Sequence, residues 1–334
     1  MSRLAVLIPN YNGGSYLREC LRSVVAQTFD DWEAVVGDNA SSDDSVSIVR
    51  AVSDRRLRLV TRPANVGWVA NVNLLLHEAR SDYVAILHAD DFWEPPFLAR
   101  MVEMLDRSPG SLLATCGSRV LTSGRPTEIR GLHEVWRGPA TSCPRKTAAR
   151  LLTMKNWLRA PSVVTRRTLF SRYPMFDESL PLVNDWLMWL RAASIGDVEV
   201  CPDPLANYRF HDASTTAESI RANHWGEEMT RMARIVQADW AHAEPFPGAR
   251  QAIAAGVAAE ILADAGLRAE RGDSAGAIIQ ARRARALAPA PQQQALAVCF
   301  EQVIRLTDLP GLRRARRPLA QIGRRVWGMF RRAA

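Results

Sequence analysis

The segment His88-Ala89-Asp90-Asp91, called here the acidic tip, places two adjacent carboxylates after the apolar run 83–87. An apolar run of this length without helical period predicts a buried strand that ends at a polar edge. Neighbouring carboxylates repel each other, so a cation is expected to hold them. Hard oxygen ligands suit Mg²⁺ or Mn²⁺, which reach such sites together with substrate phosphates. The alternative is a solvated turn that caps the helix expected from about Pro95.

The elements that must position the acidic tip precede it in the chain. Buried-strand runs alternate with segments of helical period, which is typical of βαβ units and a mainly parallel sheet. Ligands of such sheets bind just beyond the carboxyl ends of the strands. The expected strands are 4–8, 32–37, 57–61 and 83–87, and the expected helices are 16–27, 44–53 and 69–79.

Each of these four strands is followed by a polar loop. The loops are Pro9–Gly14, Asp38–Asp43, Arg62–Gly67 and the acidic tip. All four would open on one edge of the sheet, which indicates a ligand site there. Neither a G-x-G-x-x-G loop after the first strand nor a G-x-x-x-x-G-K-[ST] loop occurs, so we expect a metal to hold any phosphates.

The following part of the chain is less regular. A further strand is expected at 112–120, whereas 122–147 is rich in Gly, Pro, Thr and Arg and suggests a long loop or mobile flap. A helix is expected to open near Asp185. From about Ser219 the sequence becomes Ala-rich and helical.

Taken in order, segments between about residues 4 and 211 resemble the inverting family 2 glycosyltransferases of the GT-A fold. The resemblance implies an α/β fold with a Rossmann-like, mainly parallel sheet flanked by helices, followed by an α-helical C-terminal region. The segments that carry it are Pro9-Asn10-Tyr11-Asn12, Asp38–Asp43, Asn65-x-Gly67, the acidic tip, Phe176-Asp177-Glu178, Asn184-Asp185 and Tyr208-Arg209-x-His211.

The resemblance also implies roles for individual residues. Asp185 takes the place of the general base, and Asp90 that of the acid that meets Mn²⁺ or Mg²⁺ on the donor diphosphate. Asp91 is a further metal ligand, with His88 and His211 as additional candidates. The residues implied to bind the nucleotide or donor are Pro9, Tyr11, Asp38, Asn65, Asn71, His88, Asp90, Arg209 and His211.

Two positions depart from the family pattern. His88 stands where the first acid of an Asp-x-Asp motif is usual, and Asn184 replaces the Glu before the base. His88 removes one carboxylate near the metal, and Asn184 removes a charge that would have raised the pKa of the base.

Simpler structural roles remain open for several candidates. Asp38 would serve as a turn residue, Asp185 as a helix N-cap, and His211 as a structural histidine. Three tryptophans belong either to the core or to a platform that stacks on an acceptor sugar. They are Trp157, Trp186 and Trp189.

Three regions are expected. Residues 1–215 form the glycosyltransferase domain, with a nucleotide-binding half at about 1–120 and an acceptor half at about 121–215. Residues 216–310 form a helical C-terminal domain, in which 265–289 resembles a single tetratricopeptide-like hairpin. Residues 311–334 form a basic amphipathic tail.

The tail carries the whole excess charge of the chain. The formal net charge is +8, and eight Arg with no acidic residue follow Asp308. Apolar residues on one helical face and Arg opposite are typical of a helix that lies on an anionic membrane surface. Packing on the body is the alternative, and nucleic-acid contact is disfavoured because no groove-reading motif accompanies the charge.

Five scattered cysteines without a C-x-x-C pair indicate a reducing compartment and argue against a thiol-metal site. Neither a secretory signal nor a membrane span is expected. The predicted location is therefore cytoplasmic, peripheral on the inner face of the membrane.

The predicted function is transfer of a sugar from a nucleotide-diphosphate donor, with a UDP-sugar favoured. The acceptor would be a hydroxyl of a glycan or lipid-linked molecule in bacterial surface polysaccharide or glycolipid synthesis. The alternative is a non-catalytic sugar-nucleotide-binding or scaffold protein on the same fold. A sugar-nucleotide pyrophosphorylase would need a glycine-rich start after the first strand, which the chain lacks.

Overall fold

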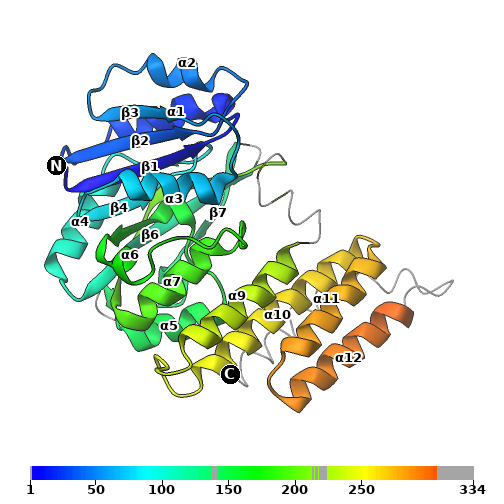
Figure 1. Cartoon of the computed structure of the whole chain (residues 1–334). Helices are drawn as coiled ribbons and strands as arrows, with labels where there is room; N and C mark the ends of the chain where they lie inside the picture. The colour runs from blue at the N-terminus through cyan, green and yellow to red at the C-terminus, as the bar shows by residue number, and fades with distance from the viewer. Residues whose placement is uncertain are drawn as a thin grey trace. The chain divides into compact units, whose positions relative to one another are not determined.

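A computed structural model describes residues 2–122, 124–136, 138, 141–212, 214, 217 and 224–306. The chain divides into two compact units (Figure 1). The first contains residues 1–148 and 157–214, and the second contains 149–156 and the residues from 215 on. Each is described below by itself.

The first unit is built on one sheet with strand order β3-β2-β1-β4-β9-β6-β10-β5. Figure 1 shows β3, β2, β1 and β4 next to one another in this order. The first four strands of the sheet are parallel, as the alternation of apolar runs and helices predicts. Asn10 pairs with Asp38, and Asp38 with Thr61, so three strand ends lie level at one edge. The strands are β1 (Leu4–Asn10), β2 (Trp32–Asp38), β3 (Leu57–Thr61) and β4 (Tyr83–Ile86).

Helices cover both faces of these strands. Leu4, Val6 and Ile8 alternate along β1 and share one hydrophobic core with α1 (Gly14–Val25), α2 (Ser45–Arg50) and α4 (Phe97–Arg107). The opposite face packs on α3 (Trp68–Glu78). Because β1 is buried on both faces, its sequence from Leu4 to Pro9 is continuously apolar instead of alternating.

The rest of the sheet departs from the expected parallel pattern. β9 (Val163–Arg166) enters between β4 and β6 (Ser111–Thr122) and is antiparallel to both. β6 is parallel to β10 (Asp197–Phe210), and β10 is antiparallel to the short β5 (Phe92–Trp93). The sheet as a whole is mixed, and the strand run 163–166 is too short for its direction to be predicted from sequence.

The expectation of a long loop or flap at 122–147 is wrong for the described residues of this range. β7 (Arg125–Arg130) pairs antiparallel with β6, and η1 (Leu132–Glu134) follows. β8 (Ser142–Cys143) pairs with β10, and α5 (Arg145–Met154) begins directly after it. Nearly all of β7 is exposed, so its sequence lacks the apolar pattern from which a strand is predicted. Its backbone is nevertheless paired with β6.

The segment before β10 contains η2 (Ala160–Ser162), α6 (Thr168–Arg172) and α7 (Asn184–Ile195). The helix predicted near Asp185 is thereby confirmed. The three tryptophans that were candidates for an acceptor platform are at most 9 % exposed and belong to the core. They are Trp157, Trp186 and Trp189.

The second unit is helical. α9 (Trp225–Asp239), α10 (Ala249–Glu270), α11 (Ser274–Leu287) and α12 (Pro291–Leu306) follow one another, and α10, α11 and α12 lie side by side (Figure 1). Asp273 caps α11 by accepting from the Gly276 N–H at 2.9 Å. A Cβ on Gly256 would lie 1.9 Å from the Thr153 carbonyl oxygen, so only glycine lets α10 pass this close to 149–156.

No helix within the described ranges is long and apolar enough to cross a membrane. The predicted amphipathic tail at 311–334 lies outside the described residues.

Candidate active site

The ends of β1 and β2 are joined through side chains. Asn10 Nδ2 donates to Asp38 Oδ1 at 2.8 Å, and the Ser41 N–H donates to Asp38 Oδ2 at 3.1 Å. Asp38 is 2 % exposed. The two oxygens of Asp38 therefore hold the second loop, as a turn residue does. This structural role does not prevent the same carboxylate from contacting a nucleotide base. The side chain of Tyr11, next to Asn10, is 53 % exposed at the same edge.

The third loop is tied to the second. Asn39 Nδ2 donates to Asn65 Oδ1 at 2.7 Å, and the Val66 N–H donates to Asn39 Oδ1 at 3.0 Å. Gly67 has φ 84°, a conformation that favours glycine, and it turns the chain into α3. Asn71 is fully buried and donates to the Gly37 carbonyl at 2.6 Å, which favours a supporting role over donor contact.

The acidic tip meets the end of β10. His211 Nε2 lies 3.1 Å from Asp90 Oδ2, and the Arg209 N–H donates to Asp91 Oδ1 at 2.8 Å. Gly13 of the first loop abuts the tip, since a Cβ there would lie 3.0 Å from the Ala89 Cβ. The structure thus brings the four polar loops to one edge and adds Arg209 near the end of β10 and His211 directly after it.

Arg209 is held on several sides. Its Nη1 donates to the Asp90 carbonyl at 2.6 Å, and its Nη2 pairs with Glu19 Oε2. The guanidinium carbon lies 5.1 Å from the ring centre of Tyr16 and 4.6 Å from that of Phe92, within cation–π range. The Tyr16 ring also lies 5.0 Å from the His211 ring.

The electrostatics of the tip separate its two carboxylates. Burial and the neighbouring Asp90 charge raise the pKa of Asp91 well above its ordinary value. Burial alone would raise the pKa of Asp90, but the hydrogen bond from His211 and the proximity of His88 hold it below the ordinary value. Burial lowers the pKa of His88, and the nearby Asp90 charge opposes this.

Asp185 lies in the first turn of α7. The N-cap of α7 is Val183, so the N-cap role considered for Asp185 is wrong; its Oδ1 instead accepts from the Trp186 N–H at 2.6 Å. Asn184 is fully buried and bonds the backbone of Asp177. The Asn at this position therefore also holds the loop before α7, in addition to removing a charge near Asp185.

Sequence reasoning missed four residues that contact His211, Arg209, His88 or the loop before α7. Tyr16 and Glu19 lie three apart on α1, which places them on one helical face beside Arg209. Trp68 and Asn73 lie on α3, and no local pattern distinguishes them from core positions. Only the folded chain shows what they contact.

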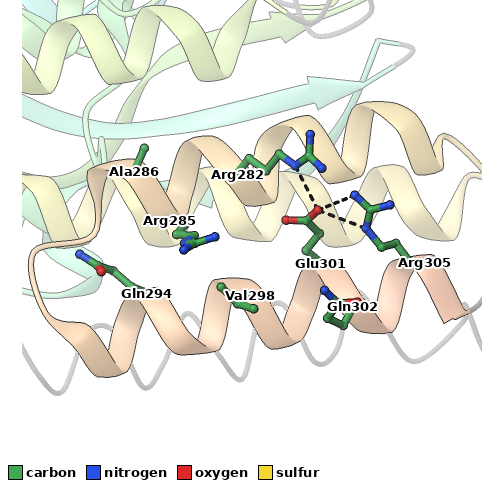
Figure 2. Close-up of a pocket in the computed structure, with 8 residues that line it drawn as sticks. All are labelled: Arg282, Arg285, Ala286, Gln294, Val298, Glu301, Gln302 and Arg305. Carbon is green, nitrogen blue, oxygen red and sulfur yellow. Dashed lines mark hydrogen bonds and ion pairs between the residues drawn. The ribbon is translucent and has the colours of Figure 1, made fainter.

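A separate groove of about 840 Å³ lies between α11 and α12 (Figure 2). Glu301 accepts there from Arg282 and Arg305, and Arg285 lines the groove with them. Among the described residues that line this groove, Glu301 is the only carboxylate, and two guanidinium groups already engage it. The groove therefore lacks the two adjacent carboxylates found at the acidic tip.

Comparison of the sequence with family models matches residues 5–170 to "Glycosyl transferase family 2". An uncharacterized protein of Mycobacterium tuberculosis is 28 % identical over 276 residues, which cover 79 % of this chain and 75 % of that protein. The succinoglycan biosynthesis protein ExoO of Rhizobium meliloti is 27 % identical over 207 residues, 61 % of this chain and 59 % of ExoO.

Two solved structures are similar over nearly the whole chain. Staphylococcus aureus TarS 1–349 in complex with UDP-GlcNAc has a TM-score of 0.65 at 17 % identity and covers 96 % of this chain and 92 % of its own. The mannosyltransferase PcManGT of Pyrobaculum calidifontis, in complex with GDP-Man and Mn²⁺, has a TM-score of 0.57 at 21 % identity and covers 96 % and 86 %. These similarities show the fold.

Proposed function

Because the chain belongs to glycosyl transferase family 2 and has the GT-A fold, we propose that it transfers a sugar from a UDP-sugar to a hydroxyl of a glycan or lipid-linked acceptor. The observation that carries this proposal is the meeting of Asp90, His211 and Arg209 at the strand edge where four polar loops converge. The Arg209 guanidinium and the His211 imidazole suit contact with the diphosphate oxygens. The Asp90 carboxylate suits the metal ion that accompanies them.

The acidic tip fits a divalent cation. Asp91 Oδ2 is buried and has no hydrogen-bond partner among the residues that the structure describes. The side chain of the adjacent Asp90 is 29 % exposed. No three His, Cys, Asp or Glu side chains of the described residues form a metal-binding group. Mg²⁺ and Mn²⁺ suit such a site, because they commonly bind one or two carboxylates together with substrate phosphates. Asp90 would hold the cation, with Asp91 and His211 beside it.

The bound cation would neutralise the charge that develops on the departing diphosphate. Arg209, held by Asp90 and Glu19, would contact the same diphosphate. Asp38 and Tyr11 would line the part of the site that binds the nucleotide. Asp185 would accept the proton of the acceptor hydroxyl as it attacks the anomeric carbon. A single displacement of this kind inverts that carbon.

The biological context is proposed from the relatives. ExoO is named for succinoglycan biosynthesis, and TarS was solved with UDP-GlcNAc. By analogy, we propose that this chain acts in surface polysaccharide or glycolipid synthesis. Its proposed location, in the cytoplasm at the inner face of the membrane, rests on the sequence alone.

Thermal unfolding with UDP, GDP and TDP, each with and without Mn²⁺, tests the donor site. A ligand at 100 times its Kd stabilises by about 2.7 kcal/mol, which for a chain of this size shifts Tm by several degrees at ~2–4 °C per kcal/mol. We expect a shift with UDP only when Mn²⁺ is present. No shift with any nucleotide would remove the proposed donor site.

Asp90→Ala and Asp185→Ala separate binding from chemistry. We expect Asp90→Ala to lose the Mn²⁺-dependent shift, and Asp185→Ala to keep it while losing sugar transfer. Asp82→Ala, which removes an exposed carboxylate on the loop before β4, is the matched control. Full transfer by both site variants would refute the assigned roles, and donor binding without turnover by the wild type would favour the non-catalytic alternative.

A further inference from the structure

The corner Phe176–Asp177, which precedes α7, is held by two asparagine side chains. Asn73 of α3 accepts from the Phe176 N–H at 2.9 Å and donates to the Phe176 carbonyl at 3.0 Å. Asn184 of α7 accepts from the Asp177 N–H at 2.9 Å and donates to the Asp177 carbonyl at 2.5 Å. Each amide thus bonds both backbone groups of one residue, as a neighbouring strand would.

Only an amide side chain of this size satisfies both groups. A carboxylate has two acceptors and no donor, so in place of Asn184 it would direct an oxygen at the Asp177 carbonyl. Asn73 is 4 % exposed and Asn184 0 %. Water therefore cannot replace a lost bond, and an unpaired buried polar group is costly. This accounts for Asn184 where a Glu would be usual.

The same helix α3 reaches the donor edge. Its first residue, Trp68, packs edge-to-face on His88 of the acidic tip, with ring centres 5.4 Å apart. The Trp68 indole N–H donates to the Pro181 carbonyl at 2.8 Å. Two contacts from α3, at Phe176 and at Pro181, therefore bracket the loop that leads into α7.

We propose that Asn73 and Asn184 are positioning residues that fix Asp185 relative to the donor edge. Asp185, the proposed base, directly follows Asn184 in the chain. Its backbone is therefore held in place by the two hydrogen bonds between the Asn184 amide and Asp177. The inference rests on the proposed function for the role of Asp185. It adds that the acceptor side and the donor side of the site are joined rigidly through α3.

The test uses the isosteric variants Asn73→Asp and Asn184→Asp, together with Asn184→Glu, in the full chain. Activity is followed as nucleoside diphosphate released from UDP-GlcNAc, UDP-glucose or GDP-mannose with Mn²⁺ and water as the acceptor. We expect kcat to fall about 10–100-fold, since small misplacements of a catalytic group have effects of this order. The donor KM and the nucleotide-induced Tm shift should stay unchanged.

Two further measurements make the result specific. Hydrogen exchange of the peptide that contains Phe176 and Asp177 should be slow in the wild type and faster in both Asp variants. The control is Ser111→Ala, which breaks the buried 2.6 Å bond from Ser111 to Glu199 and so lowers stability elsewhere in the same unit. It should leave kcat unchanged.

Fast exchange of this peptide in the wild type would overturn the clamp. Wild-type kcat in the Asp variants, or full activity of Asn184→Glu, would overturn the positioning role while leaving the proposed function intact. A wild-type chain that releases no nucleoside diphosphate would instead refute the proposed function, and with it the role assigned to the clamp.

Discussion

At the residue scale, Asp90 and Asp91 are chain neighbours in opposite environments. Asp90 has a histidine partner and a side chain that is 29 % exposed, whereas Asp91 is 1 % exposed and one of its oxygens has no hydrogen-bond partner within the described ranges. The surroundings therefore stabilise the ionised form of Asp90 and destabilise the ionised form of Asp91. Such a separation of two carboxylates is a frequent property of functional sites.

Asp91→Asn is expected to raise Tm at pH 7 in the absence of metal. The amide removes the buried charge but keeps an oxygen that accepts from the Arg209 N–H. Because burial and the Asp90 charge raise the folded-state pKa of Asp91 well above its ordinary value, the native state binds the extra proton, and its stability falls as pH rises through that pKa. The advantage of Asn should therefore shrink toward acid pH.

Unfolding scans of wild type and Asp91→Asn from pH 4 to 8 measure this difference. If Asp91 is also a metal ligand, the variant should gain less Tm from Mn²⁺ with UDP than the wild type does. A variant that is less stable than wild type at every pH would show that the Asp91 charge is stabilised by a contact other than those seen here.

At the element scale, one carboxylate joins α11 to α12 (Figure 2). Glu301 is 8 % exposed and accepts from Arg282 Nε at 3.0 Å and from Arg305 Nη2 at 2.8 Å. The hydrogen bond from Arg305, with help from Arg282, holds the pKa of Glu301 below its ordinary value, although burial opposes this. Its stabilising effect is present above about pH 4.5 and is lost as pH falls through the lowered pKa.

Glu301→Gln should lower the free energy of unfolding by about 1–2 kcal/mol at pH 7, because hydrogen bonds to a charged group weaken to neutral ones. Urea unfolding measures the change, and Gln302→Ala, an exposed neighbour on the same helix, is the control. The loss should diminish at high salt and at low pH. An unchanged midpoint would mean that the two ion pairs add nothing to the contact between α11 and α12.

The elements that sequence predicts best are those whose residues are buried as a run. β1 is apolar from Leu4 to Pro9 and β4 is apolar throughout, and α3 differs from its prediction by one residue at each end. β7 was missed because its exposed residues follow no apolar pattern. Pairing with β6 supplies the backbone bonds that make it a strand.

The candidate site likewise has parts that follow a local sequence pattern and parts that do not. The four polar loops were predicted to share an edge because strand ends carry that information locally. The clamp formed by Asn73 and Asn184 was not predicted, since its partner residues lie 103 positions away in one case and seven in the other. No local spacing rule relates an amide to a backbone corner on another element.

At the scale of the whole molecule, charge is distributed unevenly along the chain. The eight Arg after Asp308 account for the entire net charge of +8. We predict that the full chain binds vesicles of anionic lipid and that a chain ending at Leu306 does not, because polybasic segments gain about 1 kcal/mol per Arg near such a surface. Co-sedimentation at low and high salt measures this.

Neutral phosphatidylcholine vesicles are the control, and neither chain should bind them. Equal binding of both chains to anionic vesicles would place the lipid-binding surface outside the tail. Binding to duplex DNA but not to vesicles would favour nucleic acid as the partner.

The insertion of β9 beside β4 also sets the order in which the sheet can close during synthesis. Strands β1 to β4 are complete by Ile86, whereas Val164, the partner of Ala85, emerges 78 residues after Ile86. At about 5–20 residues per second, translation leaves this edge of β4 unpaired for ~4–16 s. An open apolar edge is a template for pairing with other chains, so a nascent chain stalled between these two strands is the form of this protein most prone to aggregate.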